Sequence, residues 1–355
     1  MATTPPIDIA SGPACPLPIT DYTSVLMAHG GGGRLTQQLI QKMFVPQFDN
    51  DLLAPLHDGA AITLGGATLA FSTDSYVISP IFFPGGDIGE LAVNGTVNDL
   101  AMCGARPLYL SAAFIIEEGL PMDDLWRIVL SMQAAARRAG VMIVTGDTKV
   151  VDRGKGDGIF ITTSGIGVID PGIEVSPRGA RPGDRIIVNG PIAVHGIAIM
   201  SVREGLEFET QITSDTTPLH GLTREILRAG KDVHVLRDPT RGGIASVLNE
   251  IAESSRVGIS LTEEAIPLSD EVRGACEILG LDPLYVANEG KMLAFVAPGA
   301  VDVVLDAMRS HPAGREAVVI GDVVSDHPGM VVMKSRIGGT RVVDMLSGEQ
   351  LPRIC

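Results

Sequence analysis

Acidic residues beside small residues recur along this sequence, and they are suited to binding a metal–nucleotide complex. They occur in five short strings: His57-Asp58-Gly59, Thr73-Asp74, Asn98-Asp99, Gly146-Asp147-Thr148 and Asp238-Pro239-Thr240. We expect each string where a strand or apolar run ends, and ligands bind at strand ends in α/β architectures. Mg²⁺ prefers hard oxygen ligands and shares them with nucleotide phosphates. A single Asp of this kind is more often a turn or cap residue, but five together favour a magnesium–nucleotide site. The candidate metal ligands are Asp58, Asp74, Asp99, Asp147 and Asp238.

Two glycine-rich loops could bind the phosphates of that nucleotide. The first, residues 30–33, precedes a segment that can form a helix, whose first N–H groups can bind an anion. It has neither P-loop nor Rossmann spacing, and four glycines are as often a hinge. The second, Pro239 to Gly243, opens a helix directly after Asp238 and could bind both metal and phosphate. The candidate nucleotide-binding residues are Gly30, Gly31, Gly32, Gly33, Asp74, Asn98, Asp99, Asp147, Thr148, Thr240, Gly242 and Gly243.

The last residue, Cys355, is one of four cysteines, which lie far apart and form no C-x-x-C pair. We expect all four to be free thiols. Cys103 and Cys276 lie in apolar helical surroundings and are expected to be buried, and Cys15 is incidental. Cys355 could end a frayed terminus by chance. An exposed thiol on an unstructured end is chemically hazardous, however, so we interpret Cys355 as functional.

The elements that position these residues fall into two halves. Extended and helical segments alternate from about residue 24 to 178, and a helix is predicted over 123–139 from apolar residues at i, i+3, i+4 and i+7. A turn-rich stretch, 178–184, marks a boundary, after which the mixture repeats. We expect a flexible extension at 1–20, domains at 21–180 and 181–335, and a mobile tail at 336–355. About 19 tail residues would reach on the order of 60 Å.

Composition excludes several functional classes. The chain has 355 residues and is 45% hydrophobic, enough for a substantial core and two domains. A formal net charge of -15 argues against sequence-independent binding to nucleic acid or to anionic lipid. No apolar run approaches the roughly 18 to 20 residues that span a bilayer. The N-terminal residues lack the pattern of a secretion signal, so we expect a cytoplasmic location.

Taken together, the acidic strings resemble those of the ATP-binding superfamily that contains aminoimidazole ribonucleotide synthetase, selenophosphate synthetase, thiamine-monophosphate kinase and HypE. The resemblance runs in order from about residue 24 to 333. Within that superfamily, residues 29–34, the segment Ala287 to Lys291 and the ending Pro352-Arg353-Ile354-Cys355 are similar to the HypE family. The resemblance implies a two-domain α+β fold like that of aminoimidazole ribonucleotide synthetase. It has an N-terminal mixed-sheet ATP-binding domain, a C-terminal α/β domain and a flexible C-terminal tail.

The resemblance also implies a reaction, its cofactors and its partners. In the HypE family, the carbamoyltransferase HypF carbamoylates the terminal thiol. The thiocarboxamide is then dehydrated to a thiocyanate with ATP and Mg²⁺, which supplies cyanide for the iron of NiFe hydrogenase. By resemblance, Cys355 carries the group, Lys149 stabilises the phosphoryl group and Glu289 is the base. A homodimer and a HypC–HypD complex that receives the cyanide are implied as well.

Alternatives to these roles remain open. Lys149 could be an exposed lysine paired with a nearby carboxylate, and for Glu289 the residues alone favour neither role. His29, His57 and His195 are more often structural in such positions. The whole chain could instead be a thiamine-monophosphate kinase or a selenophosphate synthetase, although neither explains Cys355. A selenophosphate synthetase needs Cys or selenocysteine beside Lys in the N-terminal loop, where residues 29–34 have neither. A non-catalytic thiol carrier would not need the acidic strings.

Overall fold

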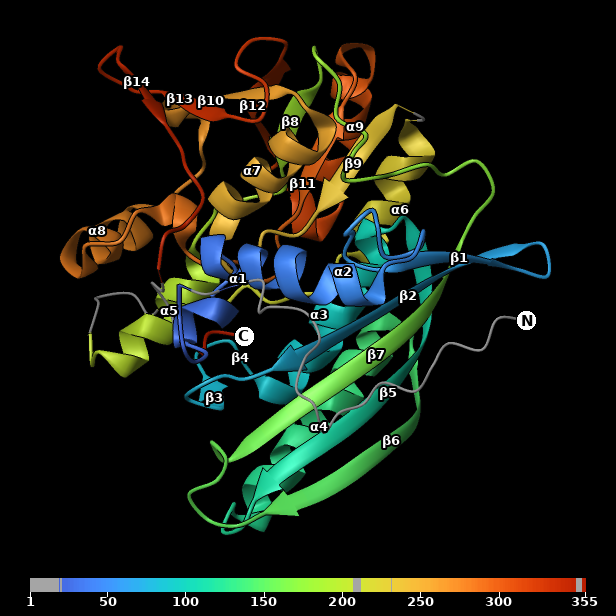
Figure 1. Cartoon of the computed structure of the whole chain (residues 1–355), viewed down its shortest axis with the longest axis vertical. Helices are drawn as coiled ribbons and strands as arrows, with labels where there is room; N and C mark the ends of the chain where they lie inside the picture. The colour runs from blue at the N-terminus through green and yellow to red at the C-terminus, as the bar shows by residue number, and fades with distance from the viewer. Residues whose placement is uncertain (1–18, 20, 207–211, 231, 349–352) are drawn as a thin grey trace.

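Two β-sheets organise the chain, one in each half of the sequence (Figure 1). The computed structural model describes residues 19, 21–206, 212–230, 232–348 and 353–355. The extension predicted at 1–20 therefore lies almost wholly outside the described residues, as does Cys15. Within the described part, the first sheet has the strand order β1-β2-β7-β5-β6 and the second β14-β13-β10-β12-β8-β11-β9. Helices accompany both sheets, which confirms the predicted α+β class.

The N-terminal half begins with a nearly continuous helical run and continues into the first sheet. The run comprises a 3-10 turn (Met27–Gly30), α1 (Arg34–Leu39), a π-helical turn (Ile40–Phe44) and α2 (Val45–Phe48). The strands are β1 (Ala60–Leu64), β2 (Ala67–Tyr76), β5 (Ala105–Glu117), β6 (Met142–Val151) and β7 (Ile159–Ile169), and a short ribbon is formed by β3 (Phe82–Phe83) and β4 (Gly86–Asp87). The helices are α3 (Ile88–Met102) and α4 (Met122–Ala139).

Helix α3 packs on one face of this sheet, against β2, β5 and β7, and α4 packs on α3. Nearly every residue of α3 is buried, as expected for a helix enclosed between a sheet and a second helix. The Asp87 side chain begins α3 by accepting hydrogen bonds from the N–H groups of Gly89 and Glu90 (2.7 and 3.1 Å). Helix α4 ends at Gly140 in the left-handed conformation, which confirms the helix predicted there.

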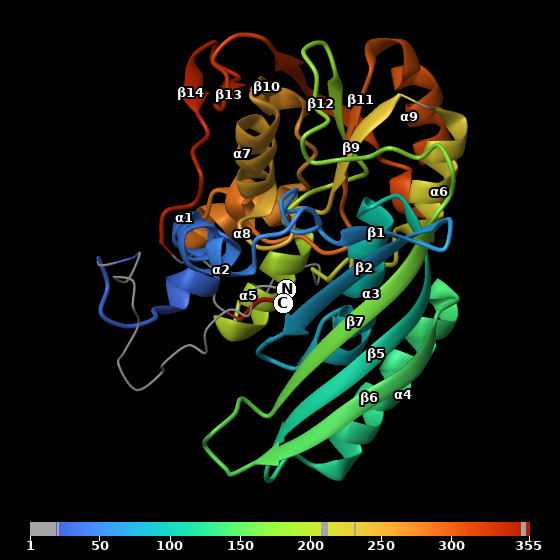
Figure 2. The same ribbon diagram turned by 45° about the vertical axis from the view of Figure 1, so that its right-hand side comes forward.

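The opposite face of the first sheet has no such cover within the described residues, and apolar side chains lie on it in a row. Phe71, Ile166, Tyr109 and Met142 are register neighbours across β2, β7, β5 and β6. Each is between 41% and 58% exposed. Figure 2 shows β6, β5 and β7 in front of α4, with this face turned outward. We call it the open face of the first sheet.

The C-terminal half has a sheet with helices on both faces. Its strands are β8 (Arg185–Val188), β9 (Val233–Arg237), β10 (Gly258–Thr262), β11 (Leu293–Val296), β12 (Val318–Val324), β13 (Val331–Lys334) and β14 (Thr340–Val342). Its helices are α5 (Val194–Arg203), α6 (His220–Ala229), α7 (Gly243–Ser255), α8 (Asp270–Leu279) and α9 (Val301–Ser310).

Strand β8 shows why this half is stable. Ile186 and Val188 lie in one buried cluster with residues of α5, α7 and α8, whereas Ile187 lies in a second cluster with residues of α6 and α9. Alternate side chains of a strand point to opposite faces, so residues 186–188 of β8 are all apolar because both faces are buried there.

The C-terminal segment 336–355 is packed on the molecule at several points. Strand β14 pairs with β13, Val343 and Met345 are buried, and the Arg34 N–H donates to the Leu346 carbonyl oxygen (2.9 Å). Ile354 is also buried, and the chain ends beside α5 and β4 (Figure 1). The mobility predicted for this segment stays a prediction, and residues 349–352 lie outside the described part.

Candidate active site

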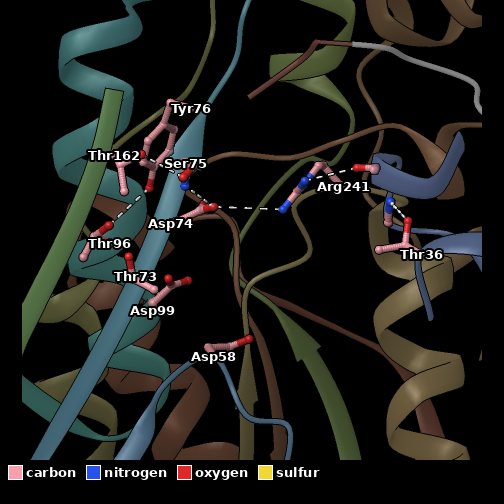
Figure 3. Close-up of polar contacts among 12 residues, drawn as sticks. Thr36, Asp58, Thr73, Asp74, Ser75, Tyr76, Thr96, Asp99, Thr162 and Arg241 are labelled. Atoms are coloured by element: carbon pink, nitrogen blue, oxygen red, sulfur yellow. Dashed lines mark hydrogen bonds and ion pairs between the residues drawn. The ribbon is translucent and has the colours of Figure 1, made fainter. Parts of the chain in front are cut away.

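Three of the predicted acidic residues meet beside β2 (Figure 3). Asp58 precedes β1, Asp74 lies on β2, and Asp99 lies on α3. The Ser72 hydroxyl links Asp58 and Asp99: it lies 2.7 Å from the Asp58 carbonyl oxygen and 2.8 Å from Asp99 Oδ2. Asp74 is on the same face of β2 as Ser72, because side chains two residues apart share a face. The group therefore lies on the α3 side of the sheet.

A fourth acidic residue, Asp238, joins this group from the end of β9. Burial raises the pKa of Asp99 well above its usual range, and Asp238 contributes most among the neighbouring carboxylates. Burial likewise raises the pKa of Asp238 to about 8, with a further contribution from Asp58. Burial also raises the pKa of Asp74. Carboxylates that raise one another's pKa values carry more negative charge than their neighbours balance, and a divalent cation would relieve that excess.

A buried oxygen without a hydrogen bond supports the same conclusion about a cation. Asp58 Oδ2 accepts no hydrogen bond from the described residues, and His57 Nδ1 lies 3.5 Å from it. Within that part of the chain, no three His, Cys, Asp or Glu side chains form a group that could hold a metal ion. Mg²⁺ usually takes one or two carboxylates and completes its shell with phosphate and water. The four carboxylates are of the type that such an ion needs.

Two arginines that the sequence analysis did not single out balance part of this charge. Arg237 Nε lies 2.9 Å from Asp58 Oδ1, and its Nη2 lies 2.9 Å from Glu250 Oε2. Arg241 Nη2 lies 4.0 Å from Asp74 Oδ1, and its Nη1 donates to the Gly30 carbonyl oxygen (3.1 Å). Arg237 and Arg241 flank the string Asp238-Pro239-Thr240. Their position beside a predicted metal ligand could have identified them as site residues from the sequence.

The two glycine-rich loops, predicted separately, pack against each other. Gly32 has φ +74°, and a Cβ there would lie 2.7 Å from the Cβ of Arg241. Gly242 has φ +75°, and its Cβ would lie 2.8 Å from the Gly32 carbonyl oxygen. Only glycine adopts this backbone conformation readily and also allows so close an approach. Because neither glycine has a side chain, the two loops can pack closely. This packing positions Arg241 near the acidic group.

A cavity of about 1070 Å³ opens next to these loops. Its lining includes Gly32 and Thr36 from the first loop and α1, Asp58 and Ser72 from the acidic group, and Arg237. Small-molecule sites commonly have volumes of this order and combine an apolar lining with a few polar groups. The cavity is thus suited to a nucleotide whose phosphates would approach Asp58.

Cys355 and Glu289 lie within electrostatic reach of the same group. Burial raises the pKa of the Cys355 thiol, the Arg241 guanidinium opposes this, and Glu289 adds to it. Glu289 is 3% exposed; burial raises its pKa well above the usual range, and Asp238 and Asp74 raise it further. The neighbouring Asn288 fixes the segment, since its Nδ2 donates to the Pro239 carbonyl oxygen (2.9 Å). The predicted thiol and the predicted base are therefore brought together.

Asp147, Thr148 and Lys149 are not brought to this group. Register neighbours place Asp147 in one row with Ala113, Thr162 and Ser75, on the opposite face from Asp74. Strands β7 and β5 separate β6 from β2, so the two aspartates are about 14 Å apart along the sheet. Lys149 Nζ instead binds the exposed Asp147 carboxylate (2.7 Å). Their metal-binding, nucleotide-binding and catalytic roles stay predictions.

Other predicted residues have structural partners. The Asn98 side chain donates to the Thr217 carbonyl oxygen (3.1 Å) and accepts from the Leu219 N–H (2.7 Å), which joins α3 to the second half. The Thr240 N–H donates to the Asp238 carbonyl oxygen (3.1 Å), which closes the second loop. Their roles in nucleotide binding also stay predictions.

The predicted position of the acids at strand ends is wrong for Asp74 and Asp147. Both lie inside their strands, β2 and β6. A polar residue did not mark the end of either strand. β2 continues to pair with β7 through Thr73, Asp74 and Ser75, and β6 continues to pair with β5 at Asp147. Asp99 lies near the end of the apolar helix α3, as expected for an acid where an apolar run ends. Only Asp238 directly follows its strand.

The sequence is similar to that of known proteins. Models of AIR synthase related protein match the chain, the N-terminal domain at residues 56–169 and the C-terminal domain at residues 181–334. Carbamoyl dehydratase HypE of Cupriavidus necator is 58% identical over 330 residues, 93% of this chain and 94% of that protein.

Two solved structures are similar over most of the chain. A crystal structure of hydrogenase maturation protein HypE in complex with ATP is 50% identical, with a TM-score of 0.79, and covers 94% of this chain and 100% of its own. A crystal structure of a HypE–HypF complex is 49% identical, with a TM-score of 0.83, and covers 87% of this chain and 99% of its own. The chain therefore belongs to the AIR synthase related family and, within it, to the HypE group of hydrogenase maturation proteins.

Proposed function

We propose that this protein is an ATP-dependent carbamoyl dehydratase that carries its substrate on Cys355. The observation that carries the proposal is the position of the chain's own last thiol, which lies within electrostatic reach of Glu289, Arg241 and the acidic group. The identity to proteins named carbamoyl dehydratase HypE supports the same reaction. The product would be a thiocyanate, which supplies cyanide for the iron of NiFe hydrogenase.

The chemistry requires an activated oxygen and a base. When bound, ATP would supply the phosphoryl group that makes the carbamoyl oxygen a leaving group. Glu289, whose pKa is raised by burial, would accept the nitrogen protons as the S–C≡N group forms. Arg241 would stabilise negative charge beside the thiol, because the nearby Cys355 raises the pKa of its guanidinium. Catalysis would then consist mainly of positioning and electrostatics.

We propose that Mg²⁺ binds at the acidic group and ATP in the adjoining cavity. Asp58, Asp74, Asp99 and Asp238 would hold the ions, with Asp58 Oδ2, which accepts no hydrogen bond, as one ligand. Gly30 to Gly33 and Thr240 to Gly243 would approach the phosphates. The ions would neutralise carboxylates that raise one another's pKa values. ATP is also the ligand of a solved HypE structure.

A homodimer is proposed from the open face of the first sheet. Its row of apolar residues across four strands is a surface of the kind that a protein partner usually covers. Lys149 and Asp147 project from the same face. In a dimer built through it, Lys149 would approach the site of the second copy, and the proposed roles of Lys149 and Asp147 would be exerted across the interface. Thr148 lies on the other face of β6, so its proposed role in nucleotide binding would not use this interface.

The remaining partners follow from the reaction. HypF would supply the carbamoyl group, as the solved HypE–HypF complex suggests, and a HypC–HypD complex would receive the cyanide. The structure contains no helix, within its described residues, that is long and apolar enough to cross a membrane. A cytoplasmic location is proposed because a reactive free thiol persists in a reducing compartment.

The alternatives explain fewer of these observations. A thiamine-monophosphate kinase or a selenophosphate synthetase needs no thiol at the end of its chain, and here that thiol lies in the site. A non-catalytic carrier needs no buried Glu289 and no group of four acids. The carbamoyl dehydratase is the one candidate that uses all of them.

Intact-protein mass spectrometry tests the proposal. The chain is incubated with carbamoyl phosphate, HypF and MgATP. We expect the chain to gain the mass of one carbamoyl group and then to lose the mass of one water. Cys355→Ala should gain nothing, whereas Cys276→Ala, a buried cysteine outside the site, should behave as wild type. An adduct of equal yield on Cys355→Ala would refute the proposal.

A further inference from the structure

The loop that carries Glu289 packs closely against a second segment, residues 215–217. Gly290 has φ +71°, and a Cβ there would lie 2.4 Å from the Asp215 carbonyl oxygen and 2.9 Å from the Thr217 nitrogen. Only glycine readily combines this backbone conformation with so close an approach. The residue directly after Glu289 therefore lies on the main chain of Asp215.

The next residue of the loop, Lys291, forms an ion pair with the side chain of Asp215. Lys291 is 9% exposed, and both carboxylate oxygens of Asp215 are buried. Asp215 Oδ1 accepts no hydrogen bond from the described residues, so the charge of this carboxylate is balanced mainly by Lys291. Buried ion pairs are often no more stabilising than apolar side chains of the same volume. The pair therefore calls for an explanation other than stability.

Hydrogen bonds fix both partners of this ion pair. Asn189 binds the main chain on either side of Lys291: its Nδ2 donates to the Gly290 carbonyl oxygen (3.2 Å), and its Oδ1 accepts from the Met292 N–H (2.8 Å). The Asp215 segment is held on α3, because Asn94 Nδ2 donates to Thr216 Oγ1 (3.4 Å) and Asn98 binds the main chain at 217 and 219. The ion pair thus joins the Glu289 loop to a segment anchored on α3.

Asp215 also acts on the charge of Glu289. Burial has the largest effect on the pKa of Glu289, and Asp238, Asp74 and Asp215 raise that pKa further. Asp238 and Asp74 belong to the acidic group, where a bound cation would neutralise them. Asp215 is instead opposed by Lys291, with or without such a cation. The other titratable groups that interact with Glu289 are Arg241, Tyr76 and Cys355.

We propose that Asp215 and Lys291 are positioning residues for Glu289. Their ion pair holds the Glu289 loop against the segment on α3, and the balance of the two charges sets how readily the Glu289 carboxyl group ionises. Neither side chain takes part in the reaction itself. The consequence for dehydration rests on the proposed function, whereas the effect on the ionisation of Glu289 does not.

Infrared difference spectroscopy tests the proposal on the full chain without nucleotide or partner. The C=O stretch of the protonated Glu289 carboxyl group is followed as the pH is raised, and the spectrum of Glu289→Gln in the same background is subtracted. Asp215→Asn leaves the Lys291 charge unopposed, so the midpoint of ionisation should fall by about one pH unit. Lys291→Gln leaves the Asp215 charge unopposed, so the midpoint should rise by about the same amount.

Two further variants separate charge from stability. Asp215→Asn combined with Lys291→Gln is neutral and should return the midpoint close to that of wild type. Asp184→Asn removes another buried carboxylate, which is paired with His234 outside the site, and should leave the midpoint unchanged even if the chain melts at a lower temperature. In single-turnover reactions, the pH profile of dehydration should shift in the same directions as the midpoints.

Opposite shifts of the two single variants are the decisive result, because a purely structural role would not produce them. Equal midpoints in all folded variants, or shifts of the same sign, would overturn the proposal. Either single variant shows the sign of its own shift, and failure of both to fold would make the pair structural and overturn the proposal as well. Because the titration contains no ATP or HypF, its failure is distinct from failure of the dehydratase.

Discussion

At the residue scale, the site combines a thiol, a carboxyl group and a guanidinium whose pKa values are all raised. Their neighbours explain each shift: burial acts on Cys355 and Glu289, whereas Cys355 and the carboxylates act on Arg241. Cys355 and Glu289 could be singled out in advance because they occur in strings that are similar to the HypE family, and their catalytic roles stay predictions. Arg241 could not, since an arginine in a loop becomes significant only when the fold brings acids to it.

Replacing Glu289 with Gln should separate the two steps of the reaction. Carbamoylation of Cys355 should proceed normally, and loss of water should slow by about 10²-fold or more, as expected for removal of a general base. The mass of the carbamoylated chain is followed with time. Glu264→Gln, an exposed glutamate outside the site, is the control. Dehydration by Glu289→Gln at the wild-type rate would exclude Glu289 as the base.

The same glutamate should shape the pH profile. Because burial raises the pKa of Glu289, the side chain stays protonated at pH values where an ordinary glutamate is ionised. A base acts only when ionised, so the dehydration rate should rise with pH beyond the usual glutamate range. The profile is measured on carbamoylated chain in single-turnover reactions. Glu289→Gln should lack this rise, and a flat wild-type profile would contradict the prediction.

At the element scale, helices were easier to predict than the faces of strands. Helix α4 has an apolar stripe, acids at its start and a glycine at its end, and all three signals are local. The face on which Asp147 lies depends on the register of β6, which shifts between Leu110 and Ser111 of β5. One residue of shift moves a side chain to the other face. The sequence therefore grouped Asp147 with Asp74 although the sheet separates them.

The contact between the two glycine loops can be tested at Gly32. Gly32→Ala should lower the free energy of unfolding by about 1–2 kcal/mol because of its positive φ, and it should weaken ATP binding because the new Cβ would displace Arg241. Denaturant unfolding and calorimetric titration measure the two effects. Gly30→Ala is the matched control, since a Cβ there meets nothing within 4 Å. Similar behaviour of the two variants would contradict the proposed loop contact.

At the scale of the whole molecule, the open face of the first sheet decides where Lys149 could act. If Lys149 serves the site of a second copy, co-expressed Lys149→Ala and Cys355→Ala chains should form dimers with one working site. Random pairing would then restore about a quarter of wild-type dehydration, as follows from a symmetric dimer. Glu289→Gln with Cys355→Ala should restore none, because Glu289 lies beside its own chain's thiol. No restoration in the first mixture would exclude a role across the interface.

The hydrogen bond from Arg34 to Leu346 has a consequence for kinetics. With Leu346 held, about nine residues remain before the thiol, and they reach no more than about 30 Å, about half of what the sequence suggested. A group on so short a tether has an effective concentration in the millimolar range. Dehydration is then a first-order event whose half-time does not change on dilution, while delivery of the carbamoyl group remains second order. Dilution alone should therefore shift the rate-limiting step from dehydration within the molecule to the bimolecular encounter that delivers the carbamoyl group.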